Sequence, residues 1–270
     1  MTPSSLLQRC RHVALLSSVC VLSACSSLTE SNVALNRYGA ITITAKNAAA
    51  GRATASINAV FFEGLSAAAP SSAAQQGDQC AYALVDTAAT GASGSLKVGE
   101  SLALTFAGNN VAMPYSTSLL RYQPAAGTLL SYGVGDAATV SIPGAAAIFP
   151  ATAVSVKLAE PIVPSPVATP AAGSPLVVNW NGTNDASAAI ILSVRYGATP
   201  TATTANEQIY CALKDDGAFQ IPATGLNAFQ ASPSALRSLA LIRWRTNEVR
   251  PDASTLLHIV STVDTIVRLP

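Results

Sequence analysis

Histidine is nearly absent from this chain of 270 residues, which contains only His12 and His258. Aromatic residues make up 6% of the sequence and charged residues 11%, against about 25% charged residues in an average soluble domain. A structural zinc site usually takes several histidine or cysteine ligands, so we expect no metal site. The formal net charge is +1, without a basic stripe or an acidic tail, which argues against nucleic acid as a partner.

The shortage of histidine also limits the catalytic chemistry that we can propose. A Ser-His-Asp site would need His258 beside a carboxylate such as Asp252 or Asp264, with a serine within reach. No G-x-S-x-G motif is present to position that serine. We therefore expect His258 to lie on a strand, facing solvent or a loop, and we predict a protein that is not an enzyme and binds no cofactor.

No apolar stretch is long enough to span a bilayer as a helix, since the stretch at residues 13–22 has only about ten residues. It follows Arg9 and Arg11 and ends in the sequence Leu22-Ser23-Ala24-Cys25. A positive start, a short apolar stretch and small residues before a cysteine predict a secretory signal peptide at residues 1–24.

The sequence Leu22-Ser23-Ala24-Cys25 resembles the lipoprotein box of bacteria. The resemblance implies cleavage between Ala24 and Cys25 and acylation of Cys25, with a diacylglycerol thioether and an N-acyl chain such as palmitate. It places the protein in the cell envelope, anchored to the bilayer, with residues 25–32 as the tether. Ser26, in place of Asp, implies the outer membrane in a cell with two membranes. Ordinary signal cleavage that leaves Cys25 unmodified is the alternative.

Only Cys80 and Cys211 remain as ordinary cysteines, because Cys10 and Cys20 leave with the signal peptide and Cys25 is assigned to the lipid. In an oxidising compartment Cys80 and Cys211 could form a disulfide between the two halves of the chain. A disulfide requires the two Cα atoms to lie within about 7 Å of each other. Two separate buried thiols are the alternative.

A cluster of prolines predicts an extended linker at residues 161–174. It separates segments of similar length, 33–160 and 175–270. Short segments of the two halves align in the same order: 38–46 with 175–180, 53–64 with 186–197, and 118–122 with 240–244, among others. This order suggests an internal duplication.

Each half consists of short alternating segments separated by Gly, Asn, Asp, Ser and Pro, which is typical of antiparallel strands. About seven strands in about a hundred residues predict a β-sandwich. The fold expected is therefore all-β, with two tandem antiparallel sandwiches at 33–160 and 175–270 after an N-terminal signal helix. Residues 176–180 and 189–196 resemble an early strand pair of the fibronectin type III and immunoglobulin-like class, with Trp180 in the core.

Two clusters of polar residues suit either calcium binding or turns. Calcium takes carboxylate, amide and carbonyl oxygens from loops, which Asn184, Asp185 and their neighbours Asn179 and Asn181 could supply. Hairpin turns favour the same residue types, and we expect turns here. The pair Asp215 and Asp216 could serve a glycosidase, but adjacent strand residues point to opposite faces, which argues against a shared site.

The two tryptophans, Trp180 and Trp244, could form an aromatic platform on which a sugar stacks. Packing in the core is the reading that we favour, because both residues have apolar strand neighbours. If Trp244 faces the core, the flanking Arg243 and Arg245 face water.

The function we expect is a non-catalytic structural, adhesive or ligand-binding role in the envelope, with an envelope protein or a glycan as partner. A carbohydrate-binding or carbohydrate-processing protein is the first alternative, and it predicts an exposed aromatic side chain with carboxylates nearby. An accessory of an envelope assembly or secretion machine is the second, and it predicts a long, unprotected sheet edge.

Overall fold

The computed structural model describes residues 36–47, 51–63, 77–84, 96–267 and 269. They belong to one compact unit, Leu35–Pro270. The other unit, Met1–Ala34, includes Ala24 and Cys25, so the predicted cleavage and lipidation site lies outside the described residues. Across the described ranges, no helix has both the length and the apolar character needed to cross a bilayer.

The described residues are rich in β-structure, as predicted. The strands of the first half are β1 (Arg37–Asn47), β2 (Ala53–Glu63), β3 (Gln79–Leu84), β4 (Ser101–Phe106), β5 (Asn109–Ser116), β6 (Arg121–Tyr122), β7 (Leu130–Tyr132), β8 (Ala137–Ile142) and β9 (Thr152–Lys157). Those of the second half are β10 (Leu176–Asn179), β11 (Ala188–Tyr196), β12 (Glu207–Lys214), β13 (Ala218–Ile221), β14 (Ser238–Asp252) and β15 (Thr255–Val267). Three short helical segments lie between β13 and β14: η3 (Ala223–Gly225), α2 (Asn227–Ala231) and η4 (Ser234–Leu236).

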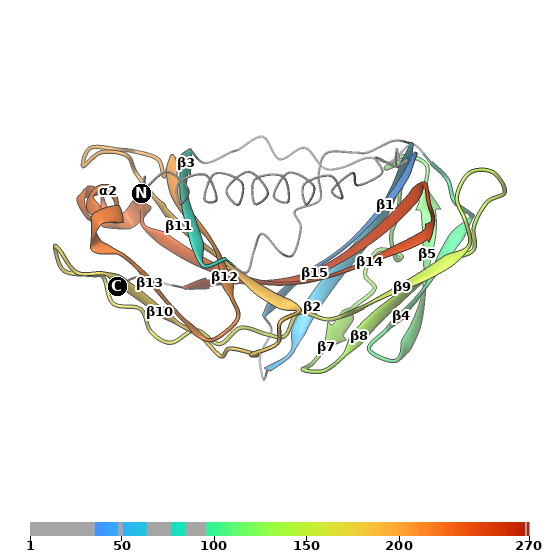
Figure 1. Cartoon of the computed structure of the whole chain (residues 1–270), viewed down its shortest axis with the longest axis horizontal. Helices are drawn as coiled ribbons and strands as arrows, with labels where there is room; N and C mark the ends of the chain where they lie inside the picture. Colours follow the sequence, from blue (N-terminus) through green and yellow to red (C-terminus); the bar gives the residue numbers. More distant parts are fainter. Residues whose placement is uncertain (1–35, 48–50, 64–76, 85–95, 268, 270) are drawn as a thin grey trace, which may run out of the picture. The chain divides into compact units, whose positions relative to one another are not determined.

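Thirteen strands form one mixed sheet, while β10 and β13 form a separate two-stranded sheet (Figure 1). The order in the large sheet is β3-β12-β11-β14-β15-β1-β2-β6-β5-β4-β8-β9, with β7 paired to β2. This sheet takes strands from both halves of the chain and contains a parallel pair, β1 with β15. The described residues therefore do not divide into the two tandem antiparallel sandwiches that we expected.

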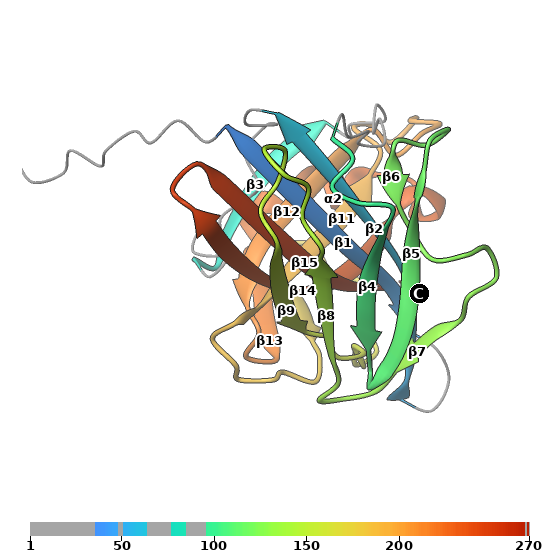
Figure 2. The ribbon, with the colours of Figure 1, turned by 90° about the vertical axis from the view of Figure 1, so that its right-hand side faces the viewer.

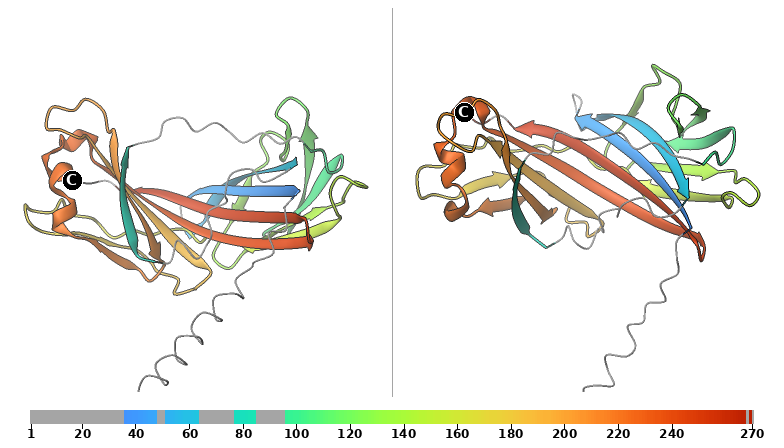
Figure 3. Two further views of the ribbon diagram at one scale, coloured as in Figure 1. Left: turned by 45° about the horizontal axis from the view of Figure 1, so that its top comes forward. Right: turned by 90° about the horizontal axis from the view of Figure 1, so that it is seen from above.

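Strands of the first half pair with strands of the second half at two places in the sheet, and we call this pairing the strand exchange. In the first, β15 runs beside β1 from the pair Arg37–Thr255 to the pair Lys46–Asp264 (Figure 3). In the second, β3 of the first half pairs with β12 of the second half. Alternation along a strand determines which face each side chain takes, but it does not select the neighbouring strand. The exchange is therefore a property of the tertiary structure.

The strands expected to be equivalent in an internal duplication agree in one pairing and differ in another. β2 pairs with β6, and their expected counterparts β11 and β14 also pair. However, β1 pairs with β2 along its whole length, whereas its expected counterpart β10 pairs with β13. The two halves thus resemble each other around β2 and β11 and differ at their first strands.

The hairpin of β14 and β15 is the longest pair of strands in the described sheet, with 15 and 13 residues. Its register shifts between Val249 and Asp252, near the turn. The edge strand β9 packs against both strands of this hairpin (Figure 2). The side-chain amide of Asn247 also donates to the Ser155 carbonyl at 2.7 Å. The hairpin therefore contacts β1 along one side and β9 across its face.

The core around β2, β4, β7 and β8 contains five fully buried aromatic rings, which we call the aromatic core: Phe61, Phe106, Tyr122, Tyr132 and Phe149. Phe61 makes edge-on contacts with Tyr122 and Phe149, with ring centroids 5.7 and 5.0 Å apart. The contact between Phe106 and Tyr132 is similar, at 5.7 Å. Edge-to-face packing is favourable because the positive edge of one ring meets the negative face of another.

The start of the proline-rich segment 161–174 is packed into the fold. Pro161 and Ile162 are buried, and the Ile162 amide donates to Asn47 Oδ1 at 3.1 Å while Asn47 Nδ2 donates back to the Ile162 carbonyl. The Val163 amide donates to Asn181 Oδ1 at 2.6 Å. Since Asn47 lies on β1 and Asn181 follows β10, this segment is hydrogen-bonded to both halves of the chain.

Candidate functional site

Arg243, in the middle of β14, is fully buried and makes a bidentate ion pair with Asp215. Its Nε donates to Oδ2 at 2.7 Å and its Nη2 to Oδ1 at 3.1 Å. Nη1 donates to the carbonyls of Glu160 and Pro161 at 2.8 and 3.1 Å, and Nη2 also donates to the Asn181 carbonyl. All five N–H donors of this guanidinium group therefore have an acceptor.

Asp215, which directly follows β12, is equally well bonded. Its Oδ1 accepts a hydrogen bond from Trp180 Nε1 at 2.8 Å, and its Oδ2 accepts one from Thr183 Oγ1 at 2.7 Å. With the two bonds from Arg243, each carboxylate oxygen accepts two hydrogen bonds. A buried ion pair is stable only when its remaining polar atoms are bonded in this way.

Arg245 extends the ion pairs toward the surface. Its Nε and Nη2 donate to the two carboxylate oxygens of Glu160 at 2.9 and 2.8 Å. Its Nη1 donates to Asp185 Oδ2 at 2.8 Å and to Ser187 Oγ at 2.7 Å. Lys157 Nζ lies 3.1 Å from Glu160 Oε1 and 3.3 Å from Asp185 Oδ2. We call Arg243, Arg245, Glu160, Asp185 and Asp215 the arginine network.

Residues two apart on a strand share a face, so Arg243 and Arg245 both point inward. Trp244 points to the opposite face of the sheet, where it is half-buried. The expectation that the two arginines face water is wrong, since their side chains are 0% and 1% exposed. Sequence reasoning missed them because their acidic partners come from distant parts of the chain.

The two acidic partners of Arg245 have lowered pKa values. Burial alone would raise the pKa of Glu160, but hydrogen bonds and charge from Arg245, with a contribution from Lys157, bring it below its ordinary value. Hydrogen bonds from the main chain and side chain of Ser187, followed by those of Arg245, lower the pKa of Asp185. Glu160 and Asp185 are therefore charged at neutral pH.

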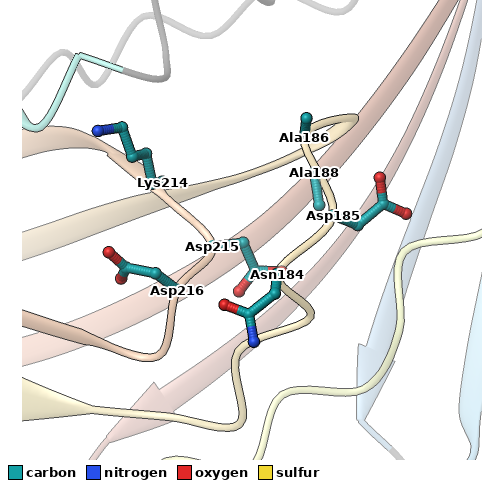
Figure 4. Close-up of a pocket in the computed structure, with 7 residues that line it drawn as sticks. All are labelled: Asn184, Asp185, Ala186, Ala188, Lys214, Asp215 and Asp216. Carbon is teal, nitrogen blue, oxygen red and sulfur yellow. The ribbon is translucent and has the colours of Figure 1, made fainter.

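A pocket of about 300 Å³ opens beside this network (Figure 4). Its lining residues are Asn184, Asp185, Ala186, Ala188, Lys214, Asp215 and Asp216. Figure 4 shows Lys214 and Asp216 on one side and Asn184 and Asp185 on the other. The carboxylates of Asp185 and Asp215 are already bonded within the network. Among the residues that the structure describes, no three His, Cys, Asp or Glu side chains are grouped to hold a metal.

The Asn and Asp clusters are used for turns and internal bonds. Asn184 has a φ of 52°, in the left-handed region that Asn tolerates in turns. The Asn181 side chain bonds the proline-rich segment, donating to the Pro161 carbonyl at 3.1 Å. Asp215 and Asp216 both line the pocket, but Asp215 is buried and Asp216 is exposed. The Asp215 carboxylate is already bonded to Arg243, Trp180 and Thr183.

The two tryptophans considered as a sugar platform are not exposed. Trp180 is 6% exposed and bonded to Asp215, and Trp244 is half-buried. Among the described residues, the exposed aromatic side chains are instead Tyr82 and Tyr210, at 57% and 40%. Alternation alone did not reveal Tyr82, because its exposure follows from the position of β3 at the edge of the sheet.

His258 is 4% exposed, which corrects the expectation that it faces solvent or a loop. Burial lowers its pKa, and the carboxylate that acts in the opposite direction is Glu248, its partner across the hairpin. Neither Asp252 nor Asp264 is opposite His258 in the register of this hairpin. The imidazole is therefore a buried, uncharged group at neutral pH.

Cys80 and Cys211 form a disulfide. The two residues lie directly opposite each other in the pairing of β3 with β12, and Cys211 is fully buried. They are 131 residues apart in the sequence, so the bond joins the two halves of the chain at one edge of the sheet.

Comparison of the chain with protein-family models, with curated proteins and with solved structures finds no match. The function proposed below therefore rests on the resemblance of Leu22-Ser23-Ala24-Cys25 to the lipoprotein box and on the geometry described above.

Proposed function

We propose that this chain is a lipid-anchored protein of the bacterial cell envelope that binds a ligand or partner without catalysing a reaction. The observation that carries the proposal is the disulfide between Cys80 and Cys211, in a chain that begins with a lipoprotein-box sequence ending at Cys25. Disulfides form and persist in oxidising compartments such as the bacterial periplasm or the cell surface. The sequence and the disulfide thus favour the same compartment independently.

The use of the ionisable side chains supports a non-catalytic role. Arg243 and Asp215 are fully buried and bonded to each other, and Arg245 and Glu160 are bonded in the same way. Because these groups are buried and bonded to one another, they are not free to act on a substrate. His258, the remaining imidazole after signal cleavage, is buried as well.

The anchor would keep the sheet close to the membrane. Eleven residues, 26 to 36, separate Cys25 from the start of β1 at Arg37. At the extended limit of about 3.6 Å per residue they reach about 40 Å. Two or more acyl chains on Cys25 would hold the protein firmly, and Ser26 favours the outer membrane. An envelope protein or a glycan within this distance is the partner that we propose.

β2 pairs with β6, and their expected counterparts β11 and β14 also pair with each other. This shared pairing supports an origin in two duplicated units of the immunoglobulin-like class, which we include in the proposal. In this interpretation the strand exchange and the long hairpin joined the two units into one sheet.

The anchor is tested by expressing the full-length protein in cells that are fed a clickable palmitate analogue. The wild-type protein should be labelled and recovered with membranes, whereas Cys25→Ser should be unlabelled and unprocessed. Cys20→Ser is the matched control, because it changes a cysteine upstream of the cleavage site and should leave the label unchanged. Label on the Cys25→Ser protein would refute the anchor.

The compartment is tested on the same cells by blocking free thiols with a maleimide before and after reduction. We expect Cys80 and Cys211 to react only after reduction. Reaction of both residues before reduction in the processed protein would contradict an oxidising location.

A further inference from the structure

A second pocket, of about 480 Å³, lies at the end of the sheet where β3 forms the edge. Figure 1 shows β3 and α2 at this end. The pocket is lined by Tyr82 of β3, Tyr196 of β11, and Thr224, Gly225, Asn227 and Ala228 of the helical segments. None of these residues belongs to the arginine network.

The ring of Tyr82 forms one wall of this pocket. It is 57% exposed, although it extends from the same face of the sheet as the buried Cys211 and Ile209. Its hydroxyl group lies against Gly225 so closely that a Cβ atom at that position would overlap it. The glycine therefore allows the ring to rest on η3 and to keep one side open to solvent.

Polar groups surround the ring. The Tyr196 hydroxyl donates to the Glu207 carboxylate, and burial together with that carboxylate raises the pKa of Tyr196 to about 12. Thr224 and Asn227 have side chains that both donate and accept hydrogen bonds. Neither side chain bonds to another residue in the part of the chain that the structure describes. Their hydrogen-bonding capacity is therefore available to a ligand.

The chemistry of the pocket distinguishes between three classes of ligand. An anion is disfavoured, because no cationic side chain lines the pocket and Glu207 is close to it. A quaternary ammonium ligand is typically held in a cage of several open ring faces. In this pocket Tyr196 is 3% exposed, so Tyr82 supplies the one open ring. A neutral pyranose has a face of C–H groups that stacks on one ring and hydroxyl groups that bond to amides, hydroxyls and carboxylates.

We propose that this pocket, the Tyr82 pocket, binds a neutral pyranose oligosaccharide, with Tyr82 as the stacking platform and Thr224 and Asn227 as hydrogen-bonding partners. The proposal specifies the ligand of the envelope protein proposed above and rests on that function for its biological setting. It also moves the sugar platform from Trp180 and Trp244 to an aromatic residue that sequence analysis did not select.

The binding test uses the full-length protein purified in a polyoxyethylene detergent, which carries no sugar headgroup. Calorimetric titration measures the affinity for two probes, the tetrasaccharide of N-acetylglucosamine and that of glucose. We expect the wild-type protein to bind at least one of them. Tyr82→Ala should weaken binding about tenfold, because it removes the stacking surface, while Tyr82→Phe should bind like the wild type.

Tyr210→Ala is the matched control, since Tyr210 is also an exposed tyrosine but lies outside the pocket. Gly225→Ala should weaken binding by displacing the Tyr82 ring, and Asn227→Ala tests the opposite wall if Tyr82→Ala folds poorly. Failure of the wild type to bind either probe, or equal affinities for Tyr82→Ala and Tyr210→Ala, would overturn the proposal. Neither result affects palmitate labelling at Cys25, so the anchor is judged separately.

Discussion

The aromatic core and the arginine network are both buried, but different interactions hold them together. Around β2, β4, β7 and β8, rings pack edge to face, and the hydroxyl groups bond to main-chain carbonyls, as Tyr132 does to Ala159 at 2.8 Å. Around β12 and β14, Arg243 and Arg245 pair with acidic side chains. Ring packing tolerates small changes of shape, whereas an ion pair without its partner leaves a charge in the interior.

The two regions meet at consecutive residues. The Ala159 carbonyl accepts the bond from Tyr132, and the next carbonyl, that of Glu160, accepts one from Arg243. The Ala159 amide donates to Ser261 Oγ on β15 at 3.0 Å. Directional bonds from both regions therefore converge on residues 159–162, in addition to the β1–β15 and β3–β12 pairings that join the two halves. The network therefore supplies directional bonds at the junction, whereas the aromatic core supplies apolar burial.

The largest effect should come from removing one partner of the most buried ion pair. Arg243→Met leaves the Asp215 carboxylate charged and buried, so we expect the free energy of unfolding to fall by about 3–5 kcal/mol. Urea unfolding followed by circular dichroism measures this change.

Arg195→Met is the matched control, because Arg195 is exposed on β11 and should change stability by less than about 0.5 kcal/mol. The double variant Arg243→Met/Asp215→Leu should recover part of the loss, since no unpaired charge remains. Equal stability of the two single arginine variants would show that the ion pair does not support this region.

A smaller effect is expected for a single hydroxyl group of the aromatic core. Tyr132→Phe keeps the ring in place but leaves the buried Ala159 carbonyl without its side-chain donor, at a cost of about 1–2 kcal/mol by urea unfolding. Tyr115→Phe serves as the control, because Tyr115 is only partly buried. A loss as large as that of Arg243→Met would mean that the two regions do not differ in the way we describe.

The smallest and most local effect should be the response to acid. The pKa of Glu160 lies below its ordinary value of 4.5, so its stabilising contribution is present above that pH and is lost as the pH falls through the lowered pKa. Asp185 acts in the same direction. The tyrosines of the aromatic core have raised pKa values, because of burial, and do not titrate in acid.

Hydrogen exchange compared at neutral pH and at about pH 3 measures this difference. Amides of β14 near Arg243 and Arg245 should lose protection before those of β4 and β8. In Glu160→Gln the protection of β14 should depend less on pH. Simultaneous loss of protection in both regions would contradict a local origin for the acid response.

Several strands could be predicted closely from the sequence. The alternating segment at 38–46 corresponds to β1 (Arg37–Asn47), and the segment at 53–64 corresponds to β2 (Ala53–Glu63). The left-handed backbone conformation of Asn184, just before the turn at residues 186–187, also agrees with its residue type. These features depend on neighbours in the sequence, through the two-residue period of a strand and the conformational tolerance of Asn.

The candidate sites were less predictable, because each depends on distant residues. Arg243 and Arg245 looked like surface residues, since isolated arginines usually are, and only the acids at positions 160, 185 and 215 make their burial stable. Tyr82 became a candidate through its contact with Gly225, far along the chain.

The sequence by itself determined the β-rich character, the extent of strands such as β2, the lipoprotein-box resemblance at Cys25, and the two cysteines available for a disulfide. Only the tertiary structure decided that β1 runs parallel to β15, that β3 joins β12, and that the two arginines point inward. The physical reason is that alternation along a strand is a local property, whereas strand partners and buried charges are selected by the free energy of the whole packed chain.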